Sequence, residues 1–214
     1  MKYWVFSILS AAIAYLFGTL NSLVIASRLV FKTNLRRIGK GSRWLPNFRR
    51  IYGVKGFAKL AAVEFIKDAF PLVIAGLLFH ADGNAVVGRA LAAFCLVLGR
   101  MYPSPYGFRG SYATGAIVVG ALFIDVSVGL AVLAATILAA WLTKYLPLGT
   151  LAGAIVLTIA GVLVLDNALA TRLCIFITIL TVVRVIPAIS RISAKKEPRL
   201  SLEEDITYKF DEQF

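Results

Sequence analysis

Long apolar segments alternate with short polar connections along almost the whole chain. A helix needs about 20 apolar residues to cross the hydrocarbon core of a bilayer, and most of the segments approach that length. They lie at residues 3–30, 57–79, 84–98, 113–124, 126–141, 148–165 and 169–186. The pattern therefore predicts an all-α fold, a polytopic integral membrane bundle of about seven transmembrane helices.

Two of these segments need separate interpretation. Residues 113–124 are too few for a straight crossing, so we expect a half-helix buried among its neighbours, with six spans as the alternative count. Residues 3–30 form a much longer apolar run than the hydrophobic region of a signal peptide, and no clean small-residue cleavage site follows it. We therefore interpret this run as a retained first helix.

Composition supports the membrane assignment. The chain of 214 residues is 59% hydrophobic, whereas soluble domains are about 45–50% apolar. A single globular core of this length cannot hide so many apolar side chains, but lipid sets no such limit. Both cysteines, Cys95 and Cys174, lie inside apolar runs, so the sequence predicts no disulfide framework, no metal site and no cofactor.

Charge is distributed unevenly. The formal net charge is +12, yet six of the eleven acidic residues lie within the last eighteen positions. Most of the remaining basic surplus falls in connections between apolar segments. We therefore expect anionic membrane lipids and phosphates as partners, and no nucleic acid.

The basic connections also predict an orientation. Residues 32–55 carry eight Lys and Arg and no acid, so the positive-inside rule makes this connection cytoplasmic. Seven spans then put the N-terminus outside and the C-terminus in the cytoplasm. The predicted division is a helix bundle over residues 1–193 and a charged cytoplasmic tail over residues 194–214.

The first basic connection has residues suited to binding an anion. Its glycines, Gly39 and Gly41, allow backbone N–H groups to converge, and its arginines offer forked donors to phosphate oxygens. The alternative is a topology signal that only touches lipid headgroups.

Charged residues also occur within the second span. Glu64, Lys67 and Asp68 lie within about one helical turn, so Glu64 and Lys67 can form a local ion pair. These charged residues can serve either to pair with each other structurally or to take a direct catalytic role.

The connection between the third and fourth segments combines two prolines with four glycines over residues 98–115. This composition favours a broken, re-entrant backbone enclosed by protein. A bland interfacial loop with tyrosines is the alternative.

Three short motifs carry a family resemblance. Residues 39–50 match Gly-Ser-Gly-Asn-x-Gly-Ala-Thr-Asn-x-x-Arg at Gly39, Gly41, Asn47 and Arg50, and in the same register Asp-x-x-Lys-Gly falls on residues 64–68. Residues 99–114 correspond to Gly-His-x-Phe-Pro followed by Phe-Lys-Gly-Gly-Lys-Gly-x-Ala-Thr, and residues 185–191 to His-x-x-Asn-Ile-x-Arg. The chain thus resembles the bacterial acyl-phosphate:glycerol-3-phosphate acyltransferases from about residue 14 to residue 193.

This resemblance implies a multi-pass protein of the bacterial cell (inner) membrane. Its implied reaction in phospholipid biosynthesis transfers an acyl group from acyl phosphate to glycerol 3-phosphate, or a related phosphorylated acceptor, to give lysophosphatidate. The implied phosphate- and substrate-binding residues are Gly39, Lys40, Gly41, Ser42, Asn47, Arg50, Lys67, Arg100, Arg109 and Gly110. No catalytic residue, oligomeric state or acyl-chain length is assigned.

Several polar motif positions differ from the family. Lys40 replaces the motif serine, Arg100 replaces a histidine, and Val185 and Ala188 replace the histidine and asparagine of the third motif. A non-catalytic relative that binds lipid or scaffolds partners is therefore the alternative function. A small-solute transporter is less favoured, because few charges lie within the spans outside the second helix.

Overall fold

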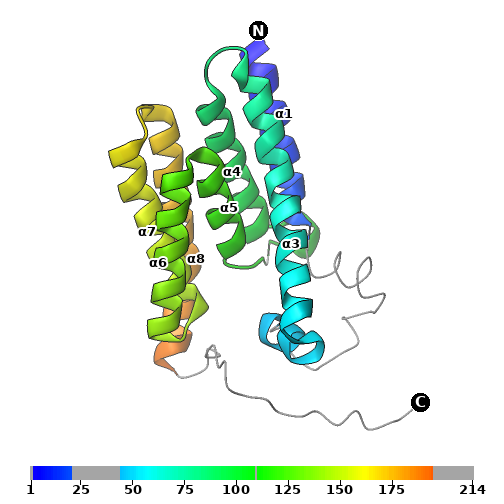
Figure 1. Cartoon of the computed structure of the whole chain (residues 1–214), viewed down its shortest axis with the longest axis vertical. Helices are drawn as coiled ribbons and strands as arrows, with labels where there is room; N and C mark the ends of the chain where they lie inside the picture. Colours follow the sequence, from blue (N-terminus) through cyan, green and yellow to red (C-terminus); the bar gives the residue numbers. More distant parts are fainter. Residues whose placement is uncertain (1, 21–43, 109, 195–214) are drawn as a thin grey trace, which may run out of the picture.

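The structure is a computed structural model that describes residues 2–20, 44–108 and 110–194. Within these ranges every regular element is helical (Figure 1). The elements are α1 (Lys2–Thr19), α3 (Trp44–His80), α4 (Ala85–Met101), the 3₁₀ turn η2 (Ser104–Tyr106), α5 (Thr114–Ile124), α6 (Val126–Thr143), α7 (Leu146–Val164) and α8 (Ala168–Ser193).

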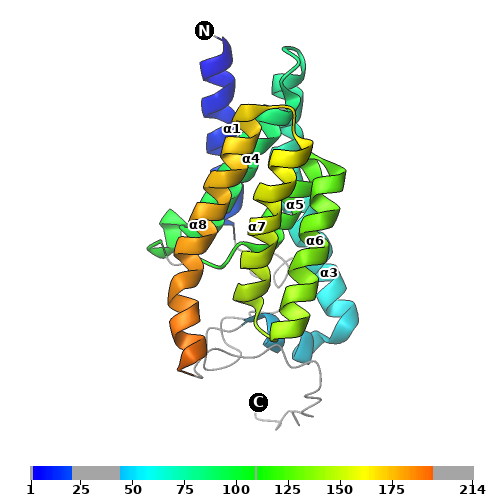
Figure 2. The same ribbon diagram turned by 90° about the vertical axis from the view of Figure 1, so that its left-hand side faces the viewer.

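The seven α-helices of the described residues run up and down the long axis of the bundle, so the start of α1 and the end of α8 lie at opposite ends (Figures 1 and 2). This arrangement agrees with an odd number of crossings. Three of the helices, α6, α7 and α8, are long and apolar enough to cross a membrane by length and composition, and α1 and α5 contain shorter apolar stretches. Which terminus faces the cytoplasm remains a prediction.

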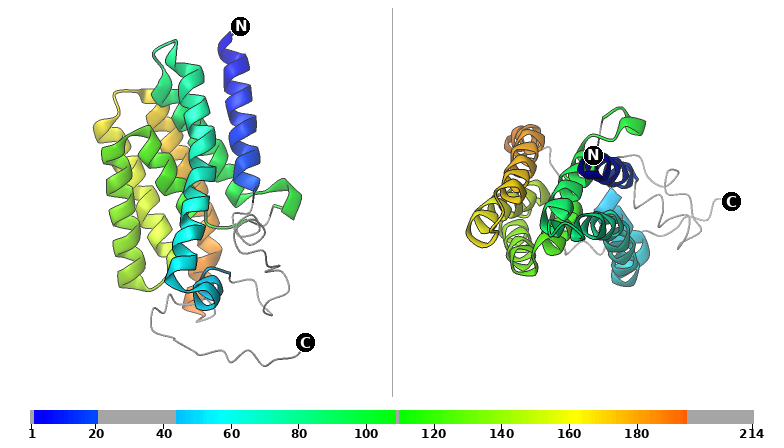
Figure 3. Two further views of the ribbon diagram at one scale, coloured as in Figure 1. Left: turned by 45° about the vertical axis from the view of Figure 1, so that its right-hand side comes forward. Right: turned by 90° about the horizontal axis from the view of Figure 1, so that it is seen from above.

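Helix α4 lies at the centre of the bundle. It packs against α1, α3, α5 and α8, and the view from above shows it with α5 between the α1–α3 side and the α6–α8 side (Figure 3). Small residues allow this close approach, because short side chains let helix backbones come near each other. A Cβ atom at Gly99 would collide with the carbonyl oxygen of Tyr15 on α1, and one at Gly18 would collide with that of Leu96.

Large apolar side chains cover the outside of the bundle. Trp4 and Leu163 are 78% and 79% exposed, and many Ile, Leu, Val and Phe residues share this orientation. Contiguous apolar surface of this extent is not found on soluble monomers, but lipid tails can cover it. The all-helical, multi-pass membrane fold predicted from hydropathy is therefore confirmed.

The short helix α5 agrees with the prediction for residues 113–124. It has only eleven residues, and six of them are buried among the neighbouring helices. Helix α3 extends beyond the predicted apolar segment 57–79, however, because it begins at Trp44, so residues 44–55 of the predicted basic connection are helical. Pro46 does not prevent this early start, because proline is tolerated in the first turn of a helix.

The ends of two further helices differ from the ends of the predicted apolar segments. Helix α1 stops at Thr19, and residues 21–30 of the predicted first span lie outside the described residues. Helix α8 continues through Pro187 to Ser193. The predicted charged tail lies almost entirely beyond the described residues, so the division at residue 193 remains a prediction.

Candidate functional site

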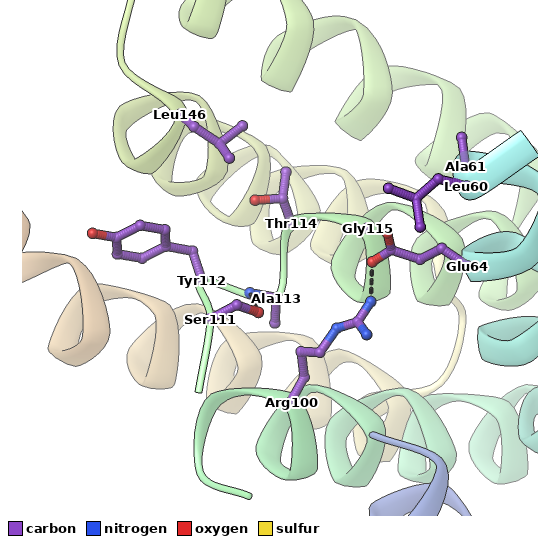
Figure 4. A pocket seen from close by; sticks show the side chains of 10 residues that line it. All are labelled: Leu60, Ala61, Glu64, Arg100, Ser111, Tyr112, Ala113, Thr114, Gly115 and Leu146. Atoms are coloured by element: carbon purple, nitrogen blue, oxygen red, sulfur yellow. Dashed lines mark hydrogen bonds and ion pairs between the residues drawn. The ribbon is translucent and has the colours of Figure 1, made fainter. Parts of the chain in front are cut away.

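A cavity of about 200 Å³ opens between α3, the beginnings of α5 and α7, and the connection that follows α4 (Figure 4). Its lining residues are Leu60, Ala61, Glu64, Arg100, Ser111, Tyr112, Ala113, Thr114, Gly115 and Leu146. Most of the wall is apolar, with the charges of Glu64 and Arg100 on one side. The cavity thus combines an apolar lining with a localised polar region.

The connection between α4 and α5 folds back on the helix that precedes it. After η2 the backbone is left-handed at Gly107 and Phe108, with φ of 60° and 59°. The returning segment donates hydrogen bonds from Gly110 N to Met101 O and from Ser111 N to Arg100 O, both at 3.2 Å. The last carbonyls of α4 are therefore satisfied by protein, which confirms the predicted broken backbone.

Ala113 then redirects this segment into α5. Its φ of 58° is left-handed, a conformation that costs a non-glycine residue about 1–2 kcal/mol. Its N–H is donated to the hydroxyl of Ser111 at 3.3 Å. The turn lies in the cavity wall, so α5 begins directly at the site, where Thr114 Oγ1 lies 2.5 Å from Thr150 Oγ1 of α7.

Four charged side chains form a buried cluster beside the cavity. Arg100 of α4 pairs with Glu64 of α3, and its guanidinium lies 3.4 Å from Asp68 Oδ2. Lys67 Nζ lies 2.8 Å from Asp68 Oδ1. The Asp68 side chain is fully buried, and the Arg100 side chain is 10% exposed. Two cations and two carboxylates balance, as a membrane interior requires, because an unpaired charge there is costly.

Lys67 is directed toward α1. Its ammonium donates to the carbonyl oxygens of Phe17 and Leu20, both at 3.2 Å, in addition to its pairing with Asp68. Two backbone carbonyls and one carboxylate thus surround the ammonium, and Lys67 does not line the cavity. The local Glu64–Lys67 pair expected from sequence does not form, because Glu64 faces Arg100 across the cavity edge.

Helix α8 holds the returning segment in place through two arginines. Arg184 donates to the carbonyl oxygen of Gly110, and its guanidinium lies 5.7 Å from the centre of the Tyr102 ring. Arg191 donates to the Tyr112 hydroxyl at 2.8 Å. Arg184 lies outside the family motifs, and its one signal in the sequence is a cation inside an apolar span.

Only some of the predicted site residues can be placed. Arg100 lines the cavity, and Gly110 lies in the returning segment beside it. Asn47 and Arg50 belong to the first turns of α3, for which only the helical backbone is described. The remaining candidates lie outside the described residues: Gly39, Lys40, Gly41, Ser42 and Arg109. Among the residues that the structure describes, no three His, Cys, Asp or Glu side chains converge as metal ligands do.

Fold and site together define a class: a multi-pass helical membrane protein with a charged, partly apolar cavity at one end of its bundle. The sequence profile of the glycerol-3-phosphate acyltransferase family matches residues 8–195. The chain therefore belongs to that family, which confirms the resemblance inferred from its motifs.

Relatives and solved structures agree with this assignment. A glycerol-3-phosphate acyltransferase of Thermoanaerobacter pseudethanolicus is 27% identical over 94% of this chain and 99% of its own length. A glycerol-3-phosphate acyltransferase of Francisella tularensis is 28% identical over 94% of this chain and 95% of its own length. The fold is similar to crystal structures of PlsY, an integral membrane glycerol 3-phosphate acyltransferase. The glycerol 3-phosphate form of PlsY is 21% identical to this chain and has a TM-score of 0.72. The match covers 91% of this chain and 96% of the PlsY chain. The lysophosphatidic acid form has a TM-score of 0.71.

Proposed function

We propose that this protein is a membrane acyltransferase of phospholipid biosynthesis that transfers an acyl group from acyl phosphate to glycerol 3-phosphate. The observation that carries the proposal is the family match over residues 8–195, which includes the whole cavity. Relatives of near-equal length are named glycerol-3-phosphate acyltransferases, so the non-catalytic alternative is not favoured.

The reaction needs no covalent enzyme intermediate. A hydroxyl oxygen of glycerol 3-phosphate attacks the carbonyl carbon of the acyl phosphate, an ester bond forms, and the bond from that carbon to the phosphate oxygen breaks. The electron pair leaves with the phosphate, which can also take the hydroxyl proton, and the other product is lysophosphatidate. Acyl phosphates are activated donors, so positioning and charge stabilisation supply most of the required rate.

Arg100 is the described cation best placed for this task. Its guanidinium lines the cavity, and a guanidinium stays charged at neutral pH and suits phosphate oxygens. Glu64 holds one side of that guanidinium in place. The apolar remainder of the lining suits the first carbons of an acyl chain. In this proposal the phosphate site is completed by Asn47, Arg50 and residues 39–42 of the first basic connection, with Arg109 and Gly110.

The orientation belongs to the same proposal. The cavity lies in the half of the bundle that contains the end of α4 and the beginnings of α5 and α7, and α3 begins on the same side, after the basic connection. With that connection in the cytoplasm, the cavity opens toward the compartment that supplies soluble phosphorylated acceptors.

The test is a turnover assay of the purified protein in a lipid mesophase, with acyl phosphate and labelled glycerol 3-phosphate. We expect labelled lysophosphatidate from the wild type and none from Arg50→Ala. Arg172→Ala, which removes an exposed cation on α8, serves as the control and retains activity. Acyl phosphate cleavage without labelled product would indicate a different acceptor. Failure to bind or cleave acyl phosphate would refute the proposal.

A further inference from the structure

A second cavity, of about 280 Å³, lies toward the other end of the bundle. Its lining residues are Val73, Gly76, Leu77, His80, Arg89 and Phe123, from the end of α3, the start of α4 and the end of α5. Arg89 and Arg100 both belong to α4, and the rise of an α-helix separates them by about 16 Å along its axis. The second cavity is therefore distinct from the proposed acyltransferase site.

Arg89 brings a cation to this cavity that protein groups satisfy only in part. Its Nη1 donates to the carbonyl oxygen of Phe123 at 3.2 Å, at the end of α5. In the described part of the chain Arg89 forms no ion pair, since all three ion pairs belong to the cluster around Arg100. A guanidinium has five donors, and one at the edge of the hydrocarbon layer needs an anion or water for the others.

The surrounding side chains suit an amphipathic anion. Gly76 leaves the room that the guanidinium occupies, because a Cβ atom there would lie 2.7 Å from Arg89 Nε. Val73 and Leu77 of the same helix are 44% and 68% exposed and form the outer, apolar wall. The cavity therefore pairs a cation with a hydrocarbon surface that continues toward the lipid.

We propose that this cavity binds an anionic phospholipid of the leaflet opposite the acyltransferase site. Arg89 donates to the lipid phosphate, and one acyl chain packs along Val73 and Leu77. Free inorganic phosphate could also pair with Arg89, but it has no acyl chain to pack against Val73 and Leu77. We therefore expect the phospholipid to bind more tightly than phosphate. This lipid site does not depend on the proposed function, because none of its residues lines the cavity at Arg100.

Native mass spectrometry with phosphatidylglycerol tests the proposal on the intact protein in detergent. The variant is Arg89→Gln. The matched control is Arg172→Gln, which removes an exposed cation near the start of α8, at the same end of the bundle (Figure 2). We expect Arg89→Gln to weaken phosphatidylglycerol binding by about tenfold, the scale of a lost charge-assisted hydrogen bond. Arg172→Gln should change it by less than about twofold.

A second variant separates lipid binding from folding. Arg89→Gln also removes the hydrogen bond to Phe123, whereas Leu77→Ser keeps the cation and its hydrogen bond and removes part of the apolar wall. We expect Leu77→Ser to weaken phosphatidylglycerol binding as well, and the melting temperature of each variant is recorded alongside. Unchanged binding in either variant, or equal loss in Arg89→Gln and Arg172→Gln, would overturn the proposal. Displacement of the lipid by millimolar inorganic phosphate would also overturn it, because that result defines a small-anion site.

Discussion

The pairing of Arg100 with Asp68 predicts a strong energetic coupling between α3 and α4. The two charges lie 3.4 Å apart, and the Asp68 side chain is fully buried. At this distance, with an effective dielectric constant of about 20, unit charges attract by roughly 5 kcal/mol before the cost of desolvation is subtracted. The family motifs carry glycine and histidine at these two positions, so both departures from the motifs meet at one contact.

The perturbation is a double-mutant cycle with Arg100→Gln and Asp68→Asn. Arg100→Gln leaves two carboxylates beside one ammonium and should cost about 4 kcal/mol, the usual scale for breaking a buried pair. Asp68→Asn should cost less, about 2 kcal/mol, because Glu64 still pairs with Arg100. The double variant has no net charge in the cluster, so we expect about 4 kcal/mol in total and a coupling of about 2 kcal/mol.

The assay is reversible unfolding in mixed micelles, followed by helical circular dichroism for the wild type, both single variants and the double variant. A parallel cycle of Asp68→Asn with Arg172→Gln is the control, and its effects should add, because Arg172 is an exposed residue of α8, whereas the ion-pair partners of Asp68 lie on α3 and α4. Additive effects in the Arg100 cycle as well would refute the reasoning. The two residues would then be neighbours without an energetic link.

Three further predictions concern helix packing, the returning segment and a helix cap. Gly99→Ala should lower the free energy of unfolding by about 1–3 kcal/mol through its clash with α1. Gly161→Ala should be tolerated, because the nearest atom to its added Cβ is Cys174 Cβ at 3.6 Å, an ordinary van der Waals contact. Arg184→Gln frees the Gly110 carbonyl and should reduce kcat/KM roughly tenfold in the turnover assay, with partial recovery in Arg184→Lys; equal activity in all three proteins would argue against a positioning role. Asp125 accepts hydrogen bonds from the Ser127 hydroxyl and from two backbone N–H groups at the start of α6, which lowers the pKa of its carboxyl below the usual value. Asp125→Ala should therefore cost about 1 kcal/mol at neutral pH. In thermal melts the cost should begin to shrink as the pH falls below about 4, where the unfolded chain takes up the proton, and should be lost below the lowered pKa of the folded state.

The membrane fold was predictable from the sequence because its cause is local. Each crossing needs its own run of apolar residues, and hydropathy records every run without knowledge of its neighbours. The short helix α5 and the broken connection after Met101 were predictable for the same reason, since length, prolines and glycines mark them. The start of α3 was not, because basic residues forbid burial in lipid but do not prevent a helix from forming outside it.

The family was also accessible from the sequence, through glycines and charged residues at fixed spacing within single connections. The partners of the charges were not. Sequence spacing favoured a pair between Glu64 and Lys67, but the structure pairs Glu64 with Arg100 and directs Lys67 to the end of α1. These choices depend on which helices pack together, and residues 36 positions apart carry no local signal of contact.

The amino-acid sequence by itself thus determined that the chain is a multi-pass helical protein, where most of its helices lie, and to which family it belongs. Only the tertiary structure decided that α4 is central, that two arginines of α8 hold the cavity wall, and that Arg89 faces a second cavity. The physical reason is the range of the interactions. Transfer of a segment into lipid depends on that segment alone, whereas the pairing of buried charges depends on the packing of helices that are distant in the chain.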